Sequence, residues 1–210
     1  MIEAQASLAD RHLSEVDPVM ATLVARLGPH GVSGGTGGFA TLANMIIGQQ
    51  LSRAAATTIR SRLEDRLGGG LTPDAILSAE GDVLRNCGLS RPKIAYLCGL
   101  ARRVVDGELD FDSLRGLPDQ AAIEALTATK GVGRWTAEMY LIFVLGRLDV
   151  LPLDDAALRA SYCRLYDVPP ADFKSSFLEA GRRWSPYGSV ACWYLYAHTN
   201  GDWATRPGLV

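Results

Sequence analysis

Apolar residues recur along most of this chain at the three- and four-residue spacing that places them on one face of an α-helix. One such stripe consists of Phe39, Leu42, Ala43, Ile46 and Ile47. Alternating runs of β-branched residues, which are typical of strands, never extend beyond a few positions. The pattern predicts an all-α fold of about ten helices, near residues 17–27, 39–47, 52–67, from 73 onward, 91–105, 119–128, 134–146, 155–166, 170–183 and 187–199.

Capping residues, proline and glycine mark where these helices begin and end. Asp17-Pro18 and Thr72-Pro73 each combine a capping side chain with a following proline, which is typical of a helix start. Residues 28–38 contain six glycines and are predicted to form a loop. The sequence GQQLS at 48–52 interrupts the apolar stripe, and Ser52 is predicted to cap the next helix.

The composition is that of a folded globular protein. The chain has 210 residues, 48% of them hydrophobic and 21% charged, enough for one core or for a core split into two lobes. The formal net charge of −2 counts only weakly against a polyanionic partner, because a local basic face can exist within a neutral total.

The cysteines and the apolar segments bear on the compartment. The chain has four cysteines: Cys87, Cys98, Cys163 and Cys192. Their spacing matches no zinc or iron–sulfur pattern, so we expect free thiols in a reducing compartment. The N-terminus has no apolar secretory segment, and the longest apolar run, Met139 to Leu145, is too short to cross a bilayer. These features predict a cytoplasmic protein.

The stretch ATKGVGRWTAEMY, residues 128–140, places two glycines just before an apolar helix. Gly131 and Gly133 lack a Cβ atom, so they can adopt positive φ and let a large anion approach the backbone. The start of the following helix offers unpaired amides and the positive end of its dipole. Lys130 and Arg134 add positive charge. The stretch is a candidate phosphate site; the alternative is a tight helix–helix turn without a ligand.

Downstream, GRLDVLPLDDAALR at 146–159 places two adjacent aspartates at the start of the next helix. One aspartate is enough to cap a helix, and we assign that role to Asp154. The carboxylate of Asp155 would then lie in the first turn, where the helix dipole and nearby amides keep it ionised. That suits an active-site anion; the alternative is an acidic residue that only favours the helix dipole.

Three segments together resemble the HhH-GPD DNA glycosylases. LTATKGVGRWTAEMYLIFVLGRLDVLPLDDAALR (126–159) is similar to their helix–hairpin–helix, Gly/Pro-rich loop and aspartate pattern. FATLANMIIGQQLS (39–52) and RWSPYGSVACWYLYA (183–197) are similar to the alkylbase branch, the 3-methyladenine DNA glycosylase II type. The resemblance extends over roughly residues 17–200, and it rests on three motifs in the same order and spacing.

The resemblance implies a fold and an activity. Residues 1–210 would form one glycosylase unit with two lobes, of about 45–148 and of about 1–44 plus 149–210, and with the active site in the cleft between the lobes. The enzyme would flip an alkylated base, such as 3-methyladenine, out of double-stranded DNA and hydrolyse its N-glycosidic bond. We expect a monomer that acts on DNA.

The resemblance also assigns DNA-binding roles. The amides of Gly131 and Gly133 would grip one DNA phosphate, with the side chain of Thr136 nearby. Gln50 and Leu51, near the end of the segment 39–52, would form the wedge that fills the gap left by the extruded base.

No cofactor is implied for the chemistry itself. A sodium or potassium ion bound by the backbone carbonyls of Thr127, Thr129 and Val132 would support the hairpin. The chain lacks a C-terminal cluster of four cysteines, so no iron–sulfur cluster is expected. This disfavours the endonuclease III and adenine-mismatch branches of the family.

For catalysis, Asp155 matches the family's aspartate, while Trp135 and Tyr196 match aromatic positions of the base pocket. An alkylated base is cationic, so an aromatic face attracts it by roughly 0.5–2 kcal/mol. Such a base leaves readily, and a fixed carboxylate then stabilises the oxocarbenium-like sugar and guides water to it. Trp135 occupies the position of the lysine nucleophile of bifunctional relatives, so we expect a monofunctional enzyme.

Position 188 departs from the family pattern, and two alternative functions fit part of the sequence. Gly188 stands where the family pattern W-x-P-[YW]-R-S has arginine, so the salt bridge or DNA contact of that arginine is not expected. A non-catalytic module that only binds DNA would explain the hairpin glycines but not Asp155 or Trp135. An oxidised-base glycosylase of the same fold is the second alternative, and single-lesion duplexes would separate it from an alkylbase enzyme.

Overall fold

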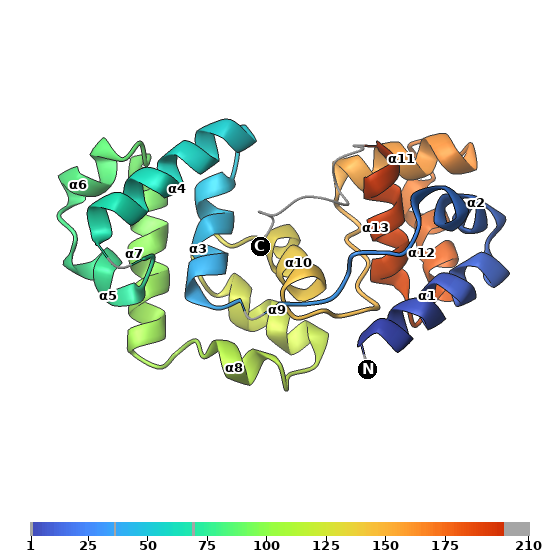
Figure 1. Ribbon diagram of the computed structural model, residues 1–210, viewed down its shortest axis with the longest axis horizontal. Helices are drawn as coiled ribbons and strands as arrows, with labels where there is room; N and C mark the ends of the chain where they lie inside the picture. The colour runs from blue at the N-terminus through green and yellow to red at the C-terminus, as the bar shows by residue number, and fades with distance from the viewer. Residues whose placement is uncertain (1, 36, 69, 200–210) are drawn as a thin grey trace. The chain divides into compact units, whose positions relative to one another are not determined.

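The computed structural model describes residues 2–35, 37–68 and 70–199, and these contain thirteen helices and no strand (Figure 1). The all-α prediction is confirmed. The predicted helices do not include α1 (Ile2–Val16), α6 (Gly81–Asn86) and α8 (Phe111–Leu114). The last two are only six and four residues long, which is too short for a helical period to be recognised.

The helices form two compact units. The terminal unit takes the described residues up to Gly35 and those from Leu141 onward, and the central unit runs from residue 37 to Tyr140. The borders therefore lie near residues 35 and 140, whereas the sequence analysis placed them near 44 and 148. The first border differs because α3 (Phe39–Gly48) packs against α7 (Arg91–Val105), which belongs to the central unit.

The core of the terminal unit is α13 (Gly188–Thr199), the red helix in Figure 1. It contacts α1, α2 (Pro18–Leu27), α11 (Ala156–Tyr166) and α12 (Phe173–Trp184). All of its residues from Gly188 to Ala197 are buried. A helix buried on every side has no polar face, so its pattern does not show which side chains point toward a site.

Asp17 joins three elements of the terminal unit. As the cap of α2, its Oδ1 accepts hydrogen bonds from the amides of Val19 and Met20 at 2.9 and 3.2 Å. Its Oδ2 accepts from the hydroxyl of Tyr166 at 2.8 Å and from the indole N–H of Trp184 at 2.9 Å. Asp17 is only 2% exposed, and these hydrogen bonds offset the desolvation of its carboxylate.

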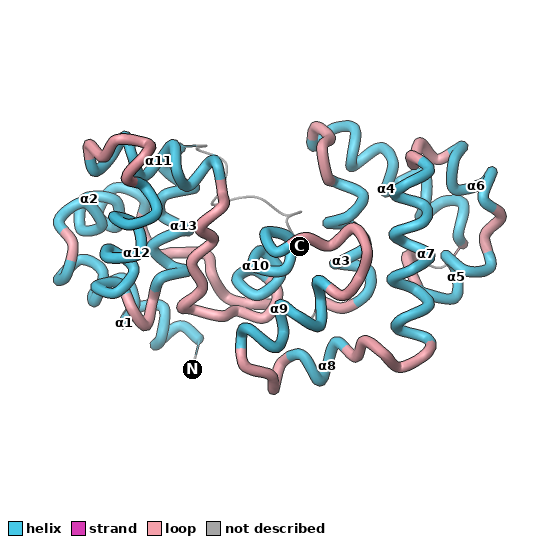
Figure 2. Tube along the Cα trace, turned by 180° about the vertical axis from the view of Figure 1, so that it is seen from behind, coloured by secondary structure: helices cyan, strands magenta, loops and turns pink. Residues whose placement is uncertain are grey.

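In the central unit, α7 contacts α3, α5 (Pro73–Ser78) and α6 (Figure 2). The side-chain oxygens of Ser52, Thr72 and Ser90 accept hydrogen bonds from the amides three residues further on. These contacts cap α4 (Arg53–Leu67), α5 and α7, and they confirm the predicted starts of these helices.

The hairpin lies between α9 (Asp119–Thr127) and α10 (Arg134–Phe143). The border between the two units falls within α10, at Tyr140 and Leu141. Within the described ranges, no helix is both long enough and apolar enough to span a membrane.

Candidate functional site

The two hairpin glycines have different structural roles. Gly131 has a φ of +93°, and a Cβ built on it would lie 2.4 Å from ring atoms of Tyr96. Gly133 does not adopt positive φ, and a Cβ built on it would have no atom within 4 Å. Gly131 is therefore required by its backbone conformation and by the packing of Tyr96, whereas Gly133 leaves open space beside the backbone.

Backbone amides of the hairpin are available to a ligand. Within the described residues, the amides of Gly131 and Gly133 donate no hydrogen bond, while the amide of Val132 donates to the carbonyl of Thr129 at 3.0 Å. Unpaired amides next to a helix start are the groups that bind anions at helix N-termini. Lys130 is exposed beside them. These features support the predicted phosphate site.

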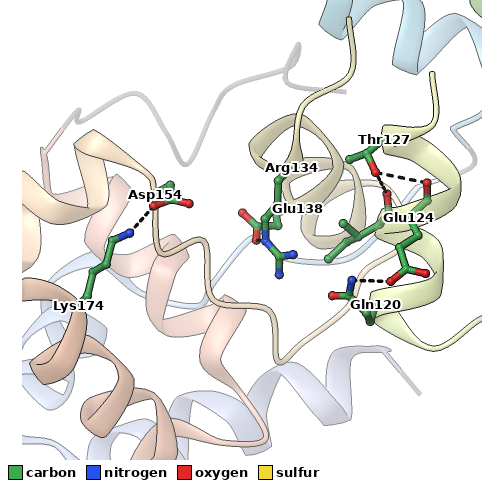
Figure 3. Close-up of polar contacts among 8 residues, drawn as sticks. Gln120, Glu124, Thr127, Arg134, Glu138, Asp154 and Lys174 are labelled. Carbon is green, nitrogen blue, oxygen red and sulfur yellow. Dashed lines mark hydrogen bonds and ion pairs between the residues drawn. The ribbon is translucent and has the colours of Figure 1, made fainter. Parts of the chain in front are cut away.

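Arg134, the other predicted phosphate contact, already has a partner. Its Nε lies 2.8 Å from Oε1 of Glu138, one turn along α10 (Figure 3). The side chain of Arg134 is 57% exposed, but that of Glu138 is only 5% exposed. Moving the guanidinium to a phosphate would deprive a buried carboxylate of this ion pair, which is unfavourable. The contact of Arg134 with DNA stays a prediction.

Gln49 holds the hairpin from the end of α3, and the sequence analysis assigned no role to it. Its Nε2 donates to the carbonyl of Gly131 at 2.9 Å and to the hydroxyl of Thr136 at 3.4 Å. Thr136 is 4% exposed, and its hydroxyl accepts this hydrogen bond inside the central unit. The DNA contact expected of Thr136 therefore stays a prediction.

The predicted ligands of a monovalent cation are the carbonyls of Thr127, Thr129 and Val132. In the described chain, those of Thr127 and Val132 accept no backbone hydrogen bond, so they fit the role. The carbonyl of Thr129 accepts from the amide of Val132 at 3.0 Å, and the hydroxyl of Thr129 accepts from the guanidinium of Arg103. The positive charge of the Arg103 guanidinium repels a sodium or potassium ion at these carbonyls and weakens its binding. The cation stays a prediction.

The predicted wedge residues lie in the loop between α3 and α4. Gln50 is exposed and has a φ of +57°, which few residues other than glycine adopt. Leu51 is 39% exposed although it is apolar. An exposed apolar side chain at a tight turn can insert between bases, so this geometry supports the wedge prediction.

Lys93, in the first turn of α7, contacts the same loop. Its Nζ donates to the carbonyls of Ile47 and Gln49, each at 2.7 Å. Both carbonyls lie at the end of α3, where a helix leaves its last carbonyls without partners of its own. Burial lowers the pKa of the Lys93 amine from its usual value.

In the terminal unit, the carboxylate of Asp155 is fixed through both oxygens. Its Oδ1 accepts from the amide of Leu158 at 2.8 Å, which makes Asp155 the N-cap of α11. Its Oδ2 accepts from the hydroxyl of Tyr196 at 2.8 Å. Asp155 is 5% exposed, and its own amide donates to the carbonyl of Pro152 at 3.2 Å. The result is an oriented carboxylate at the positive end of a helix dipole.

The capping role predicted for Asp154 is wrong. Asp155 caps α11, because the helix begins at Ala156, and Asp154 lies on the surface before it. Oδ1 of Asp154 pairs with Nζ of Lys174 at 2.6 Å, and the two side chains are 68% and 65% exposed (Figure 3). An exposed pair of this kind contributes little stability.

The two predicted pocket aromatics belong to different units. Trp135, on α10 in the central unit, is 41% exposed. Tyr196, on α13 in the terminal unit, is 1% exposed, and its hydroxyl binds Asp155. The structure thus gives Tyr196 a role in orienting a carboxylate, and contact of its ring with a base stays a prediction.

The loop after α10 is attached to the start of α13. The carboxylate of Asp149 accepts from the hydroxyl of Ser185 at 2.7 Å and from the amide of Gly188 at 3.0 Å, and the amide of Val150 donates to the hydroxyl of Ser189 at 2.8 Å. A Cβ built on Gly188 would lie 2.9 Å from Oδ1 of Asp149. The carboxylate therefore occupies the space that an arginine at 188 would need.

Comparison with known proteins identifies the family. Residues 43–186 match the HhH-GPD superfamily of base excision DNA repair proteins. The chain is 33% identical over 205 residues to DNA-3-methyladenine glycosylase 1 of Schizosaccharomyces pombe, and the match covers 95% of this chain and 90% of that protein.

Two solved structures are similar over nearly their whole length. The DNA-3-methyladenine glycosidase of Bacillus halodurans has a TM-score of 0.80 and 35% identity, covering 92% of this chain and 88% of that one. The S. pombe 3-methyladenine DNA glycosylase Mag1, solved in complex with abasic DNA, has a TM-score of 0.80 and 32% identity, covering 94% of this chain and 99% of that one.

Proposed function

Because this chain belongs to the HhH-GPD superfamily of base excision DNA repair proteins, we propose that it is a DNA glycosylase that hydrolyses the N-glycosidic bond of alkylated bases such as 3-methyladenine. The observation that carries this proposal is the carboxylate of Asp155, buried and held between the amide of Leu158 and the hydroxyl of Tyr196. An anion oriented in this way suits a reaction in which positive charge develops on a sugar.

Asp155 performs the chemical step. As the glycosidic bond breaks, the bonding electrons leave with the cationic alkylated base, which departs as a neutral molecule. Positive charge develops on the sugar, and the carboxylate stabilises it electrostatically. A water molecule then adds to C1′, and its proton passes through the carboxylate to solvent. The products are the free base and an abasic site in an intact strand.

The central unit binds the DNA. The open amides of Gly131 and Gly133 donate hydrogen bonds to one phosphate, and the charge of Lys130 adds to the attraction. Gln50 and Leu51 insert where the base has left the stack. Extrusion costs a few kcal/mol and costs least for damaged or mispaired bases, so the wedge contributes to selection as well as to binding.

Trp135 recognises the charge of the alkylated base. Trp135 is 41% exposed, and an aromatic face attracts a cationic ring more strongly than a neutral one. This property favours alkylated over oxidised bases as substrates.

The proposed enzyme is monofunctional. Trp135 provides no amine at the position after Arg134, and water is therefore the nucleophile. Burial lowers the pKa of the Lys93 amine, which by itself favours nucleophilic attack. However, Nζ of Lys93 donates hydrogen bonds to two backbone carbonyls at the end of α3, each at 2.7 Å. These bonds favour the protonated amine, which is not a nucleophile.

A panel of duplexes with one lesion each tests the proposal. We expect excision of 3-methyladenine and 7-methylguanine, no excision of 8-oxoguanine, and no strand cleavage without heat or alkali. Borohydride should trap no covalent complex. Excision confined to 8-oxoguanine would support the oxidised-base alternative, and binding without excision of any lesion would support a non-catalytic module.

We further propose that the protein acts as a monomer on double-stranded DNA in the cytoplasm. All four cysteines are free thiols, which supports a reducing compartment. The mass of the complex with a short duplex, measured by light scattering after gel filtration, should correspond to one chain per duplex.

A further inference from the structure

A chain of contacts links the wedge loop to the hairpin. Lys93 donates to the carbonyl of Gln49, and the side chain of Gln49 donates to the carbonyl of Gly131 at 2.9 Å. Gly131 in turn packs against Tyr96, which lies one turn after Lys93 on α7. The contacts therefore form a closed ring that begins and ends on one helix.

Gln49 is the residue of this ring that directly precedes the wedge residues Gln50 and Leu51. Its backbone carbonyl is fixed by Lys93 and its side chain by the hairpin, so both ends of the residue before Gln50 are held. Gln50 then adopts a φ of +57°, and Leu51 is 39% exposed. A residue other than glycine persists in that conformation only where its surroundings enforce it.

We propose that Lys93 and Gln49 are positioning residues that fix the Gln50–Leu51 wedge to the phosphate-binding hairpin. The inference rests on the proposed function, since it assumes that the wedge enters the base stack. When the hairpin binds a phosphate, the position of that phosphate then also determines where the wedge enters the base stack. Neither residue touches the reacting atoms; each acts through the loop that it holds.

A positioning role of Lys93 and Gln49 differs from a general structural role in its dependence on base pairing. A displaced wedge should slow excision only where a paired base has to be extruded, since an unpaired lesion has less stacking to lose. The quantity to measure is therefore the ratio of single-turnover excision rates for one lesion, first in a fully paired duplex and then in an unpaired bubble.

We expect Lys93→Met to lower this ratio about 10-fold, in line with the loss of hydrogen bonds from a charged donor. Lys93→Arg, which keeps the charge and can still reach a carbonyl, should restore much of it. Arg91→Met is the matched control: Arg91 is an exposed cation two residues earlier, and its loss should leave the ratio unchanged. Binding to undamaged duplex should stay within about three-fold of wild type for Lys93→Met, because the hairpin amides are intact.

Gln49→Ala provides a second variant that does not depend on the folding of Lys93→Met. It removes the link to Gly131 and leaves both carbonyls for Lys93, and it should lower the same ratio. If both variants keep the wild-type ratio, whether their rates are unchanged or fall equally on the paired and bubble substrates, the inference is wrong.

The wedge assignment is tested separately by the double variant Gln50→Ala/Leu51→Ala. If this variant keeps the wild-type ratio, the wedge part of the proposed function fails, and the inference fails with it. If it lowers the ratio while Lys93→Met and Gln49→Ala do not, the wedge stands and only the inference is wrong.

Discussion

The hydroxyl of Tyr196 donates a 2.8 Å hydrogen bond to Oδ2 of Asp155, across 41 residues of sequence. Because Oδ1 of the same carboxylate accepts from the amide of Leu158, rotation of the side chain would break at least one of these bonds. An aromatic side chain that the sequence suggests as a pocket wall thus restrains the charged group that the proposed chemistry requires.

Removing this restraint should slow the chemical step without weakening DNA binding. We expect Tyr196→Phe to lower the single-turnover excision rate about 10-fold, as for the loss of a hydrogen bond to a charged group. The affinity for a duplex with an abasic site should stay within about two-fold, because the hairpin is unchanged. If affinity falls as much as rate, Tyr196 acts mainly on DNA binding rather than on Asp155.

Asp155→Asn should reduce excision by at least about 100-fold, since it keeps the shape of the side chain and removes the charge that stabilises the sugar. Asparagine also caps helices well, so α11 should persist, as circular dichroism would show. Asp154→Asn is the matched control: this neighbour is exposed and its carboxylate pairs with Lys174 at the surface, so its substitution should leave excision near wild type. Comparable losses in both variants would point to the charge of the loop rather than to Asp155.

Alanine should destabilise the fold at one of the two hairpin glycines and not at the other. Gly131→Ala should lower the free energy of unfolding by about 2 kcal/mol or more, through its left-handed backbone and the overlap with Tyr96. Gly133→Ala should leave stability within about 0.5 kcal/mol, since its Cβ meets no atom.

The same Gly133→Ala variant should weaken binding to damaged and undamaged duplexes about equally, because phosphate contacts carry no base information. Urea unfolding and fluorescence anisotropy give the two quantities. A loss confined to lesion-bearing DNA would contradict a phosphate role for this glycine.

Trp135→Leu should discriminate between charged and neutral bases. Leucine keeps an apolar surface and removes the aromatic face, so excision of cationic lesions should fall about 5-fold or more. Excision of a neutral, destabilised base such as hypoxanthine should fall less. Equal losses for both classes of base would argue that Trp135 contributes by shape alone.

The stability of the fold should decline at alkaline pH. Burial, and after it the negative charge of Asp17, raises the pKa of Tyr166 well above its usual value. Above about pH 10 the unfolded chain loses this proton while the folded chain retains it, so the free energy of unfolding falls with rising pH, by up to about 1.4 kcal/mol per pH unit for one such group. Urea titrations at several pH values should show a shallower decline for Tyr166→Phe, and an identical slope would contradict this account.

The sequence was sufficient to predict the all-α class, most helix starts and the hairpin, because these depend on local periodicity, caps and glycines. It placed the cap of α11 at Asp154 instead of Asp155, since choosing between adjacent aspartates requires knowing that the amide of Asp155 closes a turn onto Pro152. It also assigned no role to Gln49, whose side-chain partner Gly131 lies 82 residues away. Contacts of that range depend on how helices pack and leave no periodic signal.

The role of Tyr196 also depends on helix packing and could not be predicted from the sequence pattern. Because α13 is buried on every side, its sequence has no polar stripe to indicate which side chain faces Asp155. The motif resemblance identified Tyr196 as a residue of interest, but only the packed helix shows that its hydroxyl, rather than its ring, contacts the carboxylate.

The contact between Asp149 and Gly188 couples two positions that lie 39 residues apart in the sequence. A Cβ at position 188 would lie 2.9 Å from Oδ1 of Asp149 and 3.0 Å from Leu151, so any side chain there has to displace one of these neighbours. Substitutions at 149 and 188 should therefore be epistatic: an arginine at 188 should cost less stability when Asp149 is replaced by alanine than when Asp149 is kept.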